Sequence, residues 1–207
     1  MNLNEIKLHR LTHISNIRHI ITYGITHKKS LNRNPNYKAI GDSGLIDKRS
    51  AIIIPNNNTL LGDYIPFYFG TRMPMLYIIQ KGFNGLVLID PEELIYCITN
   101  VQQILDMEIP FLFTNAHAST KRCRFYGFDQ VNQLEEIVDF VAVRNQTWGK
   151  EENLDTKHKK EAEFLVYTDI PFNGITNFAV YNSSAQKQLI DLGIHASQIV
   201  INHKYYY

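Results

Sequence analysis

The sequence predicts a mixed α+β fold that forms a single domain over residues 1–207. Short runs rich in β-branched and aromatic residues recur along the chain, and segments with apolar residues at helical spacing lie between some of them. The two kinds of segment do not alternate regularly, which disfavours a doubly wound parallel sheet. A composition of 44% hydrophobic and 20% charged residues is typical of a globular protein and excludes collagen, a coiled coil and wholesale disorder.

The chain is expected to open with a strand, a short helix and a long loop. Residues 6–14 alternate apolar and polar side chains for most of their length, which predicts the strand. Ser15 is expected to cap a short helix that Gly24 ends. Residues 26–46 are rich in Asn, Lys, Gly and Pro, so we expect an irregular segment that closes over a ligand.

The remainder of the chain is expected to contain more strands than helices. Strand-like runs occupy residues 51–54, 64–69, 85–89, 94–99, 111–115, 163–167 and 177–181. Helical spacing predicts helices at residues 101–107, 131–141 and 184–192, the last of them ending at Gly193. The sequence has neither a Gly-x-Gly-x-x-Gly nor a Gly-x-x-x-x-Gly-Lys motif, which excludes ordinary Rossmann and P-loop sites.

The cellular location is predicted from segments that the sequence lacks. No apolar run approaches the roughly 18 residues that a membrane-spanning helix needs. The first residues have neither the basic start nor the apolar stretch of a signal peptide, so we expect a cytoplasmic protein that spans no membrane. Cys97 and Cys123 form no Cys-x-x-Cys pair, and we therefore expect reduced thiols and no metal site.

Charge is distributed unevenly along the chain. Residues 1–62 contain nine Lys or Arg against three acids, whereas residues 63–116 contain two against six. The electropositive first third is compatible with a pocket for a phosphate-bearing ligand, and equally with an ordinary solvated surface.

Several short segments, taken in order, resemble one known family. They are Thr12-His13-Ile14-Ser15-Asn16-Ile17, Tyr23-Gly24-Ile25, Pro66-Phe67-Tyr68-Phe69-Gly70, Pro74-Met75-Leu76-Tyr77, Phe113-Thr114-Asn115-Ala116-His117-Ala118 and Ala162-Glu163-Phe164-Leu165-Val166. Over nearly the whole chain these segments resemble the DarT family of DNA ADP-ribosyltransferase toxins. The chain departs from the family at Met73, where a serine is common, and at Asn115 and Ala116, which replace an Asp-Gly pair.

The resemblance implies a fold, a reaction and a partner. The fold is that of an ADP-ribosyltransferase, with central mixed or antiparallel sheets and flanking helices. The reaction would cleave NAD at the nicotinamide glycosidic bond and pass ADP-ribose to a base in single-stranded DNA. Thymidine is the commonest acceptor in the family, and guanosine is used by some relatives. Such an enzyme is the toxin of a toxin–antitoxin pair, so the resemblance also implies a macrodomain-type antitoxin as its partner.

Glu163 and Arg49 are the predicted catalytic residues. Departure of nicotinamide leaves positive charge on the ribose, and a carboxylate beside the sugar would stabilise it. Glu161 lies on the same side of the predicted strand, and spacing alone does not separate it from Glu163; the resemblance selects Glu163. Arg49 could hold the pyrophosphate and, by the resemblance, act on the acceptor base, although a guanidinium with a pKa above ~12 is no ordinary general base.

Candidate NAD contacts lie near the end of the first strand and in two apolar runs. The His13 imidazole could bind a ribose hydroxyl, and its alternative interpretation is a capping or core histidine. The resemblance adds Ile14, Ser15 and Gly24. Tyr68 and Met75 could wall the nicotinamide site, although such residues in apolar runs usually belong to the core.

Residues 109–128 contain no acid and are the predicted DNA-binding segment. Cations and aromatic rings are interleaved there, which suits single strands, because phosphates bind the charges while unstacked bases lie on the rings. The candidates are His117, Lys121, Arg122, Arg124 and Tyr126. Two other functions remain open: a non-catalytic module that binds single strands, and a transferase that modifies RNA or protein.

Overall fold

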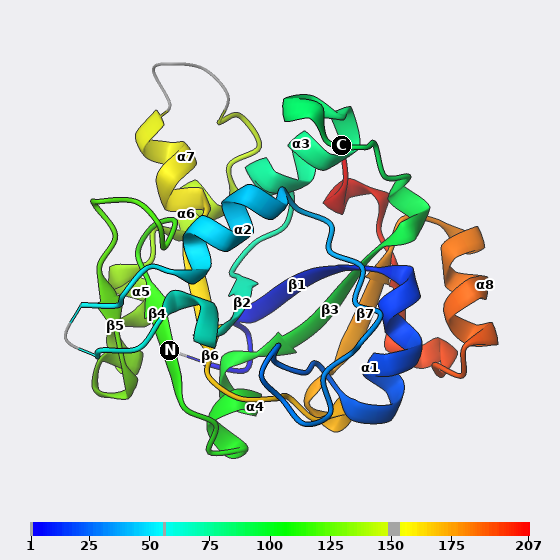
Figure 1. Ribbon diagram of the computed structural model, residues 1–207, viewed down its shortest axis with the longest axis horizontal. Coiled ribbons are helices and arrows are strands. Elements are labelled where there is room, and N and C mark those ends of the chain that lie inside the picture. Colours follow the sequence, from blue (N-terminus) through cyan, green and yellow to red (C-terminus); the bar gives the residue numbers. More distant parts are fainter. Residues whose placement is uncertain (1, 56, 149–153) are drawn as a thin grey trace.

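One eight-stranded sheet forms the centre of the computed structural model, which describes residues 2–55, 57–148 and 154–207 (Figure 1). Its strands are β1 (Lys7–His13), β2 (Ile65–Tyr68), β3 (Leu94–Asn100), β4 (Phe111–Thr114), β5 (Phe125–Tyr126), β6 (Glu163–Val166), β7 (Asn177–Val180) and β8 (Ile199–Ile201). The strand order is β5-β4-β6-β2-β1-β3-β7-β8, and every neighbouring pair is antiparallel except β7 and β8. The predicted α+β fold with a mixed, mostly antiparallel sheet is confirmed.

The register aligns three residues of interest across neighbouring strands. His9 of β1 lies opposite Tyr68 of β2, and Tyr68 lies opposite Glu163 of β6. Directly opposed residues of antiparallel strands project from the same face of a sheet. These three side chains therefore form a row on one face.

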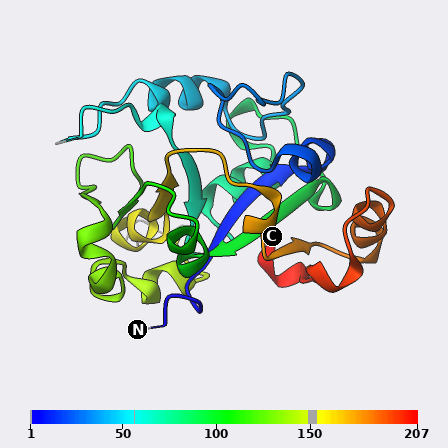
Figure 2. The same cartoon turned by 90° about the horizontal axis from the view of Figure 1, so that it is seen from below.

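Helices cover both faces of the sheet, because both faces are apolar. The α-helices are α1 (Ile17–Tyr23), α2 (Ser43–Ser50), α3 (Pro74–Lys81), α4 (Val101–Asp106), α5 (Leu134–Ile137), α6 (Phe140–Arg144), α7 (Leu154–Lys160) and α8 (Ser183–Asp191). The larger core joins Phe67 and Phe164 to residues of α1, α4, α5 and α8, whereas a second core joins Tyr68 and Tyr96 to α3. Figure 2 shows the segment between α1 and β2, coloured lighter blue to cyan, as a layer along one side of the sheet.

Two predicted strands are wrong. Of residues 51–54, only Ile53 forms a bridge, with Leu60, because the chain is leaving α2. Residues 85–89 are not a strand either: a 3-10 turn, Phe83–Gly85, precedes an irregular run. Val87 is 85% exposed, whereas Leu86 and Ile89 pack against the second core, so this apolar run contacts a core without joining the sheet.

Two further boundaries differ from the prediction. The loop expected at residues 26–46 ends early, because the Asp42 side chain accepts the Leu45 N–H at 3.0 Å and starts α2. The helix expected at residues 131–141 is divided into a 3-10 turn, α5 and α6, because Val138 is extended and Asp139 caps α6.

Some short elements were not anticipated. Helix α3 begins at Pro74 inside a motif read only as a family landmark, while α7, β5 and β8 carried no sequence prediction. None of the helices in the described ranges is long and apolar enough to cross a membrane.

Candidate active site

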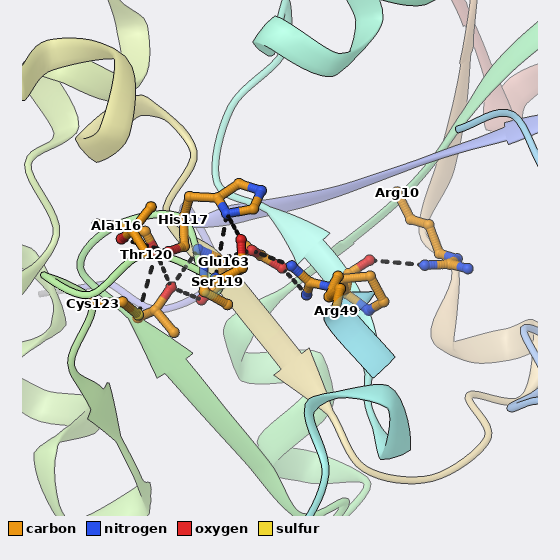
Figure 3. Close-up of polar contacts among 11 residues, drawn as sticks. Arg10, Arg49, Ala116, His117, Ser119, Thr120, Cys123 and Glu163 are labelled. Atoms are coloured by element: carbon orange, nitrogen blue, oxygen red, sulfur yellow. Dashed lines mark hydrogen bonds and ion pairs between the residues drawn. The ribbon is translucent and has the colours of Figure 1, made fainter. Parts of the chain in front are cut away.

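Arg49 and Glu163 form an ion pair at the buried start of β6 (Figure 3). Arg49 Nη1 donates to Glu163 Oε1 at 2.8 Å, and Nη2 donates to Oε2. The backbone N–H of Ala118 also donates to Oε1, at 2.9 Å. The Glu163 side chain is fully buried, while that of Arg49 is 20% exposed.

Three elements bring this pair together. Glu163 is the first residue of β6, and its own N–H donates to Thr114 Oγ1 on β4 at 2.9 Å. Arg49 lies in the last turn of α2 and reaches the sheet from the covering layer. Because α2 buries none of its own residues, the Arg49 side chain is a principal link between this helix and the sheet.

The pair keeps both groups charged. Burial alone would raise the pKa of Glu163, but the Arg49 guanidinium outweighs it and holds that pKa below its usual value. Burial would likewise lower the pKa of Arg49, and Glu163 instead raises it. Arg49 therefore remains a cation and does not accept a proton.

The geometry separates Glu163 from Glu161, which spacing did not. Within the described part of the chain Glu161 forms no hydrogen bond or ion pair with Arg49, and burial raises the pKa of its carboxyl to about 7. Glu163 is the ionised carboxylate, with three donors on two oxygens and one acceptor position left on Oε2. Such a group can stabilise a developing cation.

The guanidinium covers this carboxylate. Cavities of about 540 and 400 Å³ lie elsewhere, and neither is lined by Arg49 or Glu163. A substrate reaches Glu163 Oε2 only if Arg49 shifts. Because α2 has no buried residues, this movement breaks few apolar contacts.

His13 lies at the end of β1 and caps the following 3-10 turn, Ile14–Asn16. Its Nδ1 accepts the Ser15 N–H at 3.0 Å, so the prediction that Ser15 itself caps the helix is wrong: the imidazole has taken that place. Asn16 precedes α1, and its side chain bonds Thr12 and the Lys38 carbonyl instead of capping. The capping interpretation of His13 is thus correct for Nδ1, which leaves Nε2 for another partner.

Gly24 ends α1, as predicted. Its φ is +77°, and a Cβ there would lie 2.0 Å from the Ile170 carbonyl oxygen. Ile25 and Ile170 form a bridge at this point, so the glycine lets two distant segments meet.

Tyr68 and Met75 lie on the same side of the sheet as Glu163. Tyr68 is buried, and burial together with the Glu163 charge raises the pKa of its hydroxyl. Met75 is half-buried on α3 and packs against the core that contains Tyr68. Both side chains take part in the core, as the alternative interpretation expected.

Four of the predicted DNA-binding residues lie on the loop between β4 and β5, and Tyr126 lies on β5 itself. His117 accepts from the Ser119 backbone N–H and lies 2.7 Å from its hydroxyl, and Lys121, Arg122 and Arg124 are exposed. Burial lowers the pKa of His117. Tyr126 pairs with Phe113 and stacks on its ring, so one face of the tyrosine is already covered.

Sequence reasoning missed three groups near these residues. The Ala118 N–H and the Thr114 hydroxyl hold Glu163. Both belong to the segment Phe113–Ala118, in which the sequence did not indicate a role for either group. Glu93 Oε1 lies 3.3 Å from His13 Nε2, and no spacing rule connects residues 80 apart. Among the described residues no cluster of three or more His, Cys, Asp or Glu is placed to hold a metal ion.

Known proteins resemble this chain in sequence and in fold. A DNA ADP-ribosyl transferase from Thermus sp. (strain 2.9) is 30% identical over 193 residues, covering 89% of this chain and 86% of the relative. A structure of Thermus sp. 2.9 DarT in complex with ADP-ribosylated ssDNA superimposes with a TM-score of 0.84 at 26% identity, covering 98% of this chain and 96% of that one. The same protein in complex with NAD+ gives a TM-score of 0.76 at 26% identity, covering 98% of each chain.

A longer relative joins two activities in one polypeptide. A DNA ADP-ribosyl transferase-DNA ADP-ribosyl glycohydrolase fusion protein from Thermosipho africanus is 26% identical over 162 residues, which cover 77% of this chain and 38% of the fusion. The family model described as "ssDNA thymidine ADP-ribosyltransferase, DarT" matches residues 9–207. The chain therefore belongs to the DarT family of single-stranded-DNA thymidine ADP-ribosyltransferases.

Proposed function

We propose that this chain, as one catalytic domain over residues 1–207, transfers ADP-ribose from NAD to thymine in single-stranded DNA. The observation that carries the proposal is the buried, ionised Glu163 clamped by Arg49 in a member of the DarT family. Relatives of the same fold are described with NAD+ and with ADP-ribosylated ssDNA, which supports the same two substrates here. A module that only binds single strands would not need this charged pair to be buried.

In the first step the bond between nicotinamide and the ribose carbon breaks. Its electron pair goes to the ring nitrogen of nicotinamide, which leaves neutral, and the ribose acquires oxocarbenium character. The Glu163 carboxylate stabilises that charge, and its remaining Oε2 position accepts a ribose hydroxyl. The dinucleotide displaces part of the Arg49 contact as it enters.

In the second step a ring nitrogen of thymine gives its proton to a water molecule and uses its freed electron pair to bond to the same ribose carbon. Arg49 stays protonated, because Glu163 raises its pKa, so it does not take the proton. We assign to Arg49 the tasks of holding the pyrophosphate and stabilising the deprotonated base. Single-stranded DNA is preferred because a paired base hides this nitrogen.

The other proposed NAD contacts surround the end of β1. His13 binds a ribose hydroxyl, while the backbone of Ile14 and Ser15 holds the nicotinamide amide, next to Gly24. Tyr68, on β2, and Met75, on α3, contact the nicotinamide ring from two sides.

The proposed DNA path follows the exposed loop between β4 and β5. Lys121, Arg122 and Arg124 contact phosphates, and His117 lies closest to Glu163, whose charge acts on its imidazole. Tyr126 offers only its uncovered face to a base.

We further propose that the chain acts as a toxin and that a macrodomain-type antitoxin reverses its mark. The support is the Thermosipho africanus relative, whose printed description joins the transferase to a DNA ADP-ribosyl glycohydrolase. The reaction is proposed to occur in the cytoplasm, where NAD and DNA are both present.

The test is incubation with labelled NAD and four separate acceptors: single-stranded DNA, the matching duplex, RNA and protein. We expect label on thymine-containing single strands, with loss when every thymine is replaced. Label on guanine, on RNA or on protein would contradict the assigned acceptor. No transfer to any acceptor, with single-strand binding retained, would favour the binding module.

A further inference from the structure

A cavity of about 540 Å³ lies beside the start of β1, outside the site described above. Pockets for small ligands have volumes of about 300–1,000 Å³, so this one has room for a molecule as large as a nucleotide. The cations of its lining outnumber the carboxylates by five to two, and they are Lys7, Arg72, Arg144, Lys160 and Lys204. An excess of positive charge in a concave site favours an anionic ligand.

Lys160 is a deeply buried cation of this cavity. It is only 2% exposed, and its Nζ donates to the Val143 carbonyl oxygen at 2.8 Å. An ammonium group has three donors. Among the described residues no carboxylate forms an ion pair with Lys160. A buried charge without a counter-ion is costly, so an anion that enters the cavity would stabilise this ammonium.

A second cation increases the need for an anion. Burial and the charge of Arg72 lower the pKa of Lys160 to about 8. The charge of Glu161 acts in the opposite direction, but burial raises the pKa of this carboxyl to about 7, so it is only partly ionised near neutral pH. The repulsion between Lys160 and Arg72 is therefore not fully balanced by this acid.

Arg72 is held in position before any ligand arrives. Its φ is +54°, a left-handed conformation that residues other than glycine adopt only when their surroundings enforce it. Its guanidinium lies over the Tyr207 ring, 4.4 Å from the ring centre, and the Tyr207 hydroxyl donates to the Arg72 carbonyl oxygen. A cation that is already ordered loses less conformational entropy when it binds.

A phosphomonoester fits this arrangement better than a phosphodiester. Near neutral pH it carries a charge of about −1.5 to −2 and presents three acceptor oxygens. A guanidinium can bind two of these oxygens side by side, while an ammonium binds as a point charge. Because Lys160 is buried, only a group that enters the cavity reaches it, and a terminal phosphate enters more readily than the middle of a strand.

The cavity is separate from the path to Glu163. Neither Glu163 nor Arg49 lines it. In Figure 2 the N-terminus, which lies near the cavity residue Lys7, is on the opposite side of the molecule from the layer that contains α2. A dinucleotide that enters past Arg49 therefore leaves this cavity free.

We propose that the cavity is a second ligand site, which binds a phosphomonoester between Lys160 and Arg72. Both a free nucleotide and the phosphorylated end of a DNA strand carry this group. The proposal goes beyond the transfer of ADP-ribose and does not depend on it.

The test is calorimetric titration of the full chain, near neutral pH and at constant ionic strength, with deoxycytidine 5′-monophosphate and with deoxycytidine. Neither compound contains thymine, the proposed acceptor. We expect wild type to bind the monophosphate at least about tenfold more tightly than the nucleoside, and Lys160→Met to weaken monophosphate binding at least about tenfold. Lys159→Met is the matched control, because Lys159 instead pairs with Asp155 at 2.8 Å and Asp139 at 3.5 Å. It should change the Kd less than about twofold.

Two deoxycytidine oligonucleotides, one with a 5′-phosphate and one with a 5′-hydroxyl, distinguish the sources of the group. Tighter binding of the phosphorylated strand by wild type, but not by Lys160→Met, identifies a strand end as the ligand. Equal binding of both strands, with binding of the monophosphate retained, identifies a free nucleotide.

A second variant keeps the test decisive if circular dichroism shows that Lys160→Met does not fold. Lys7 and Lys204 are exposed, and replacing both with Gln should weaken monophosphate binding at least about threefold. An unchanged Kd in folded Lys160→Met, or in this double variant, would overturn the proposal. Equal affinity of wild type for monophosphate and nucleoside, or equal weakening in Lys159→Met, would also overturn it. Each of these results would leave the proposed transferase function intact.

Discussion

Glu163 is a charged side chain with no exposure to solvent, and it is stable there because every lone pair but one has a donor. Burying an ion pair costs desolvation that only good geometry offsets, and removing one partner leaves an uncompensated charge. The two Arg49 bonds and the Ala118 N–H supply that geometry. Glu161, two residues earlier, is also buried, and among the described residues the charges of Lys157 and Lys160 oppose its desolvation without outweighing it.

The difference predicts how stability depends on pH. Burial raises the pKa of Glu161 from its usual range to about 7, so its protonated form is favoured in the folded protein. The stability this provides is complete below the unfolded pKa and is lost as pH rises through about 7. Glu161→Gln should therefore be more stable than wild type at pH 8, by up to about 3 kcal/mol.

Urea unfolding of the two proteins at pH 4.5 and pH 8 provides the measurement. The advantage of Glu161→Gln should disappear at the lower pH, where both side chains are neutral. If Glu161→Gln is as stable as wild type at both pH values, or less stable than wild type at pH 8, then Glu161 is not a buried acid.

The choice between these carboxylates could not be made from the residues alone. Their spacing of two residues would place both on one side of an extended chain, and the deciding partner, Arg49, is 114 residues away from Glu163 in sequence. His13 was different: its capping position was one of two stated interpretations, because the residues that it caps follow it directly.

Among the elements, the turn at the end of α1 depends on one glycine. Gly24→Ala meets a left-handed φ of +77° and a contact of 2.0 Å with the Ile170 carbonyl oxygen. We expect a loss of about 3 kcal/mol, of which the backbone conformation alone accounts for about 1. Gly85→Ala is the control, since its φ is +74° and a Cβ there meets nothing within 4 Å.

Thermal unfolding of both glycine variants separates steric clash from backbone strain. Similar losses in the two variants would mean that the segment at Ile170 moves aside freely and that the bridge between Ile25 and Ile170 has little effect on stability.

The basic loop between β4 and β5 should give DNA binding its salt dependence. Replacing Lys121, Arg122 and Arg124 together by Gln removes three exposed charges. The slope of log affinity against log salt for single strands should fall by about 2. Lys187→Gln, on α8 across the molecule in Figure 1, should leave the slope unchanged.

Fluorescence polarisation of a labelled oligonucleotide over a range of salt concentrations measures these slopes. An unchanged slope in the triple variant would remove this loop from the DNA path.

Helices and strands could be predicted from the sequence where the local pattern of apolar residues matches the burial of those residues in the fold. The strands β1, β3 and β7 were predicted because β-branched runs there do join the sheet. Residues 85–89 have the same composition, but Gly82 and Gly85 both take positive φ and lead the run away from any edge. Helix α2 was missed because it buries no residue and so has no apolar stripe to detect.

For the whole molecule, strand order argues for one cooperative unit. The central strand β1 pairs with β2 and β3. Two strands from the C-terminal part of the chain extend the sheet on either side of these three: β6 pairs with β2, and β7 pairs with β3. No cut along the chain leaves two complete sheets in the described ranges. We predict a single calorimetric transition whose van't Hoff and calorimetric enthalpies agree, and two separate transitions would contradict the one-domain proposal.

The order of the family segments along the chain was enough to predict the fold, because most of them lie on or beside a sheet strand. The extent to which Arg49 covers Glu163 could not be predicted from the sequence, because it depends on the position of the weakly packed helix α2 relative to the sheet.

The most direct test is mass spectrometry of a thymine-containing single strand after incubation with NAD and either wild type, Glu163→Gln or Glu161→Gln. We predict one added ADP-ribose on thymine with wild type and with Glu161→Gln, and a rate at least about 100-fold lower with Glu163→Gln. Circular dichroism of each variant establishes that it is folded. A folded Glu163→Gln protein that modifies the strand at the wild-type rate would contradict the account.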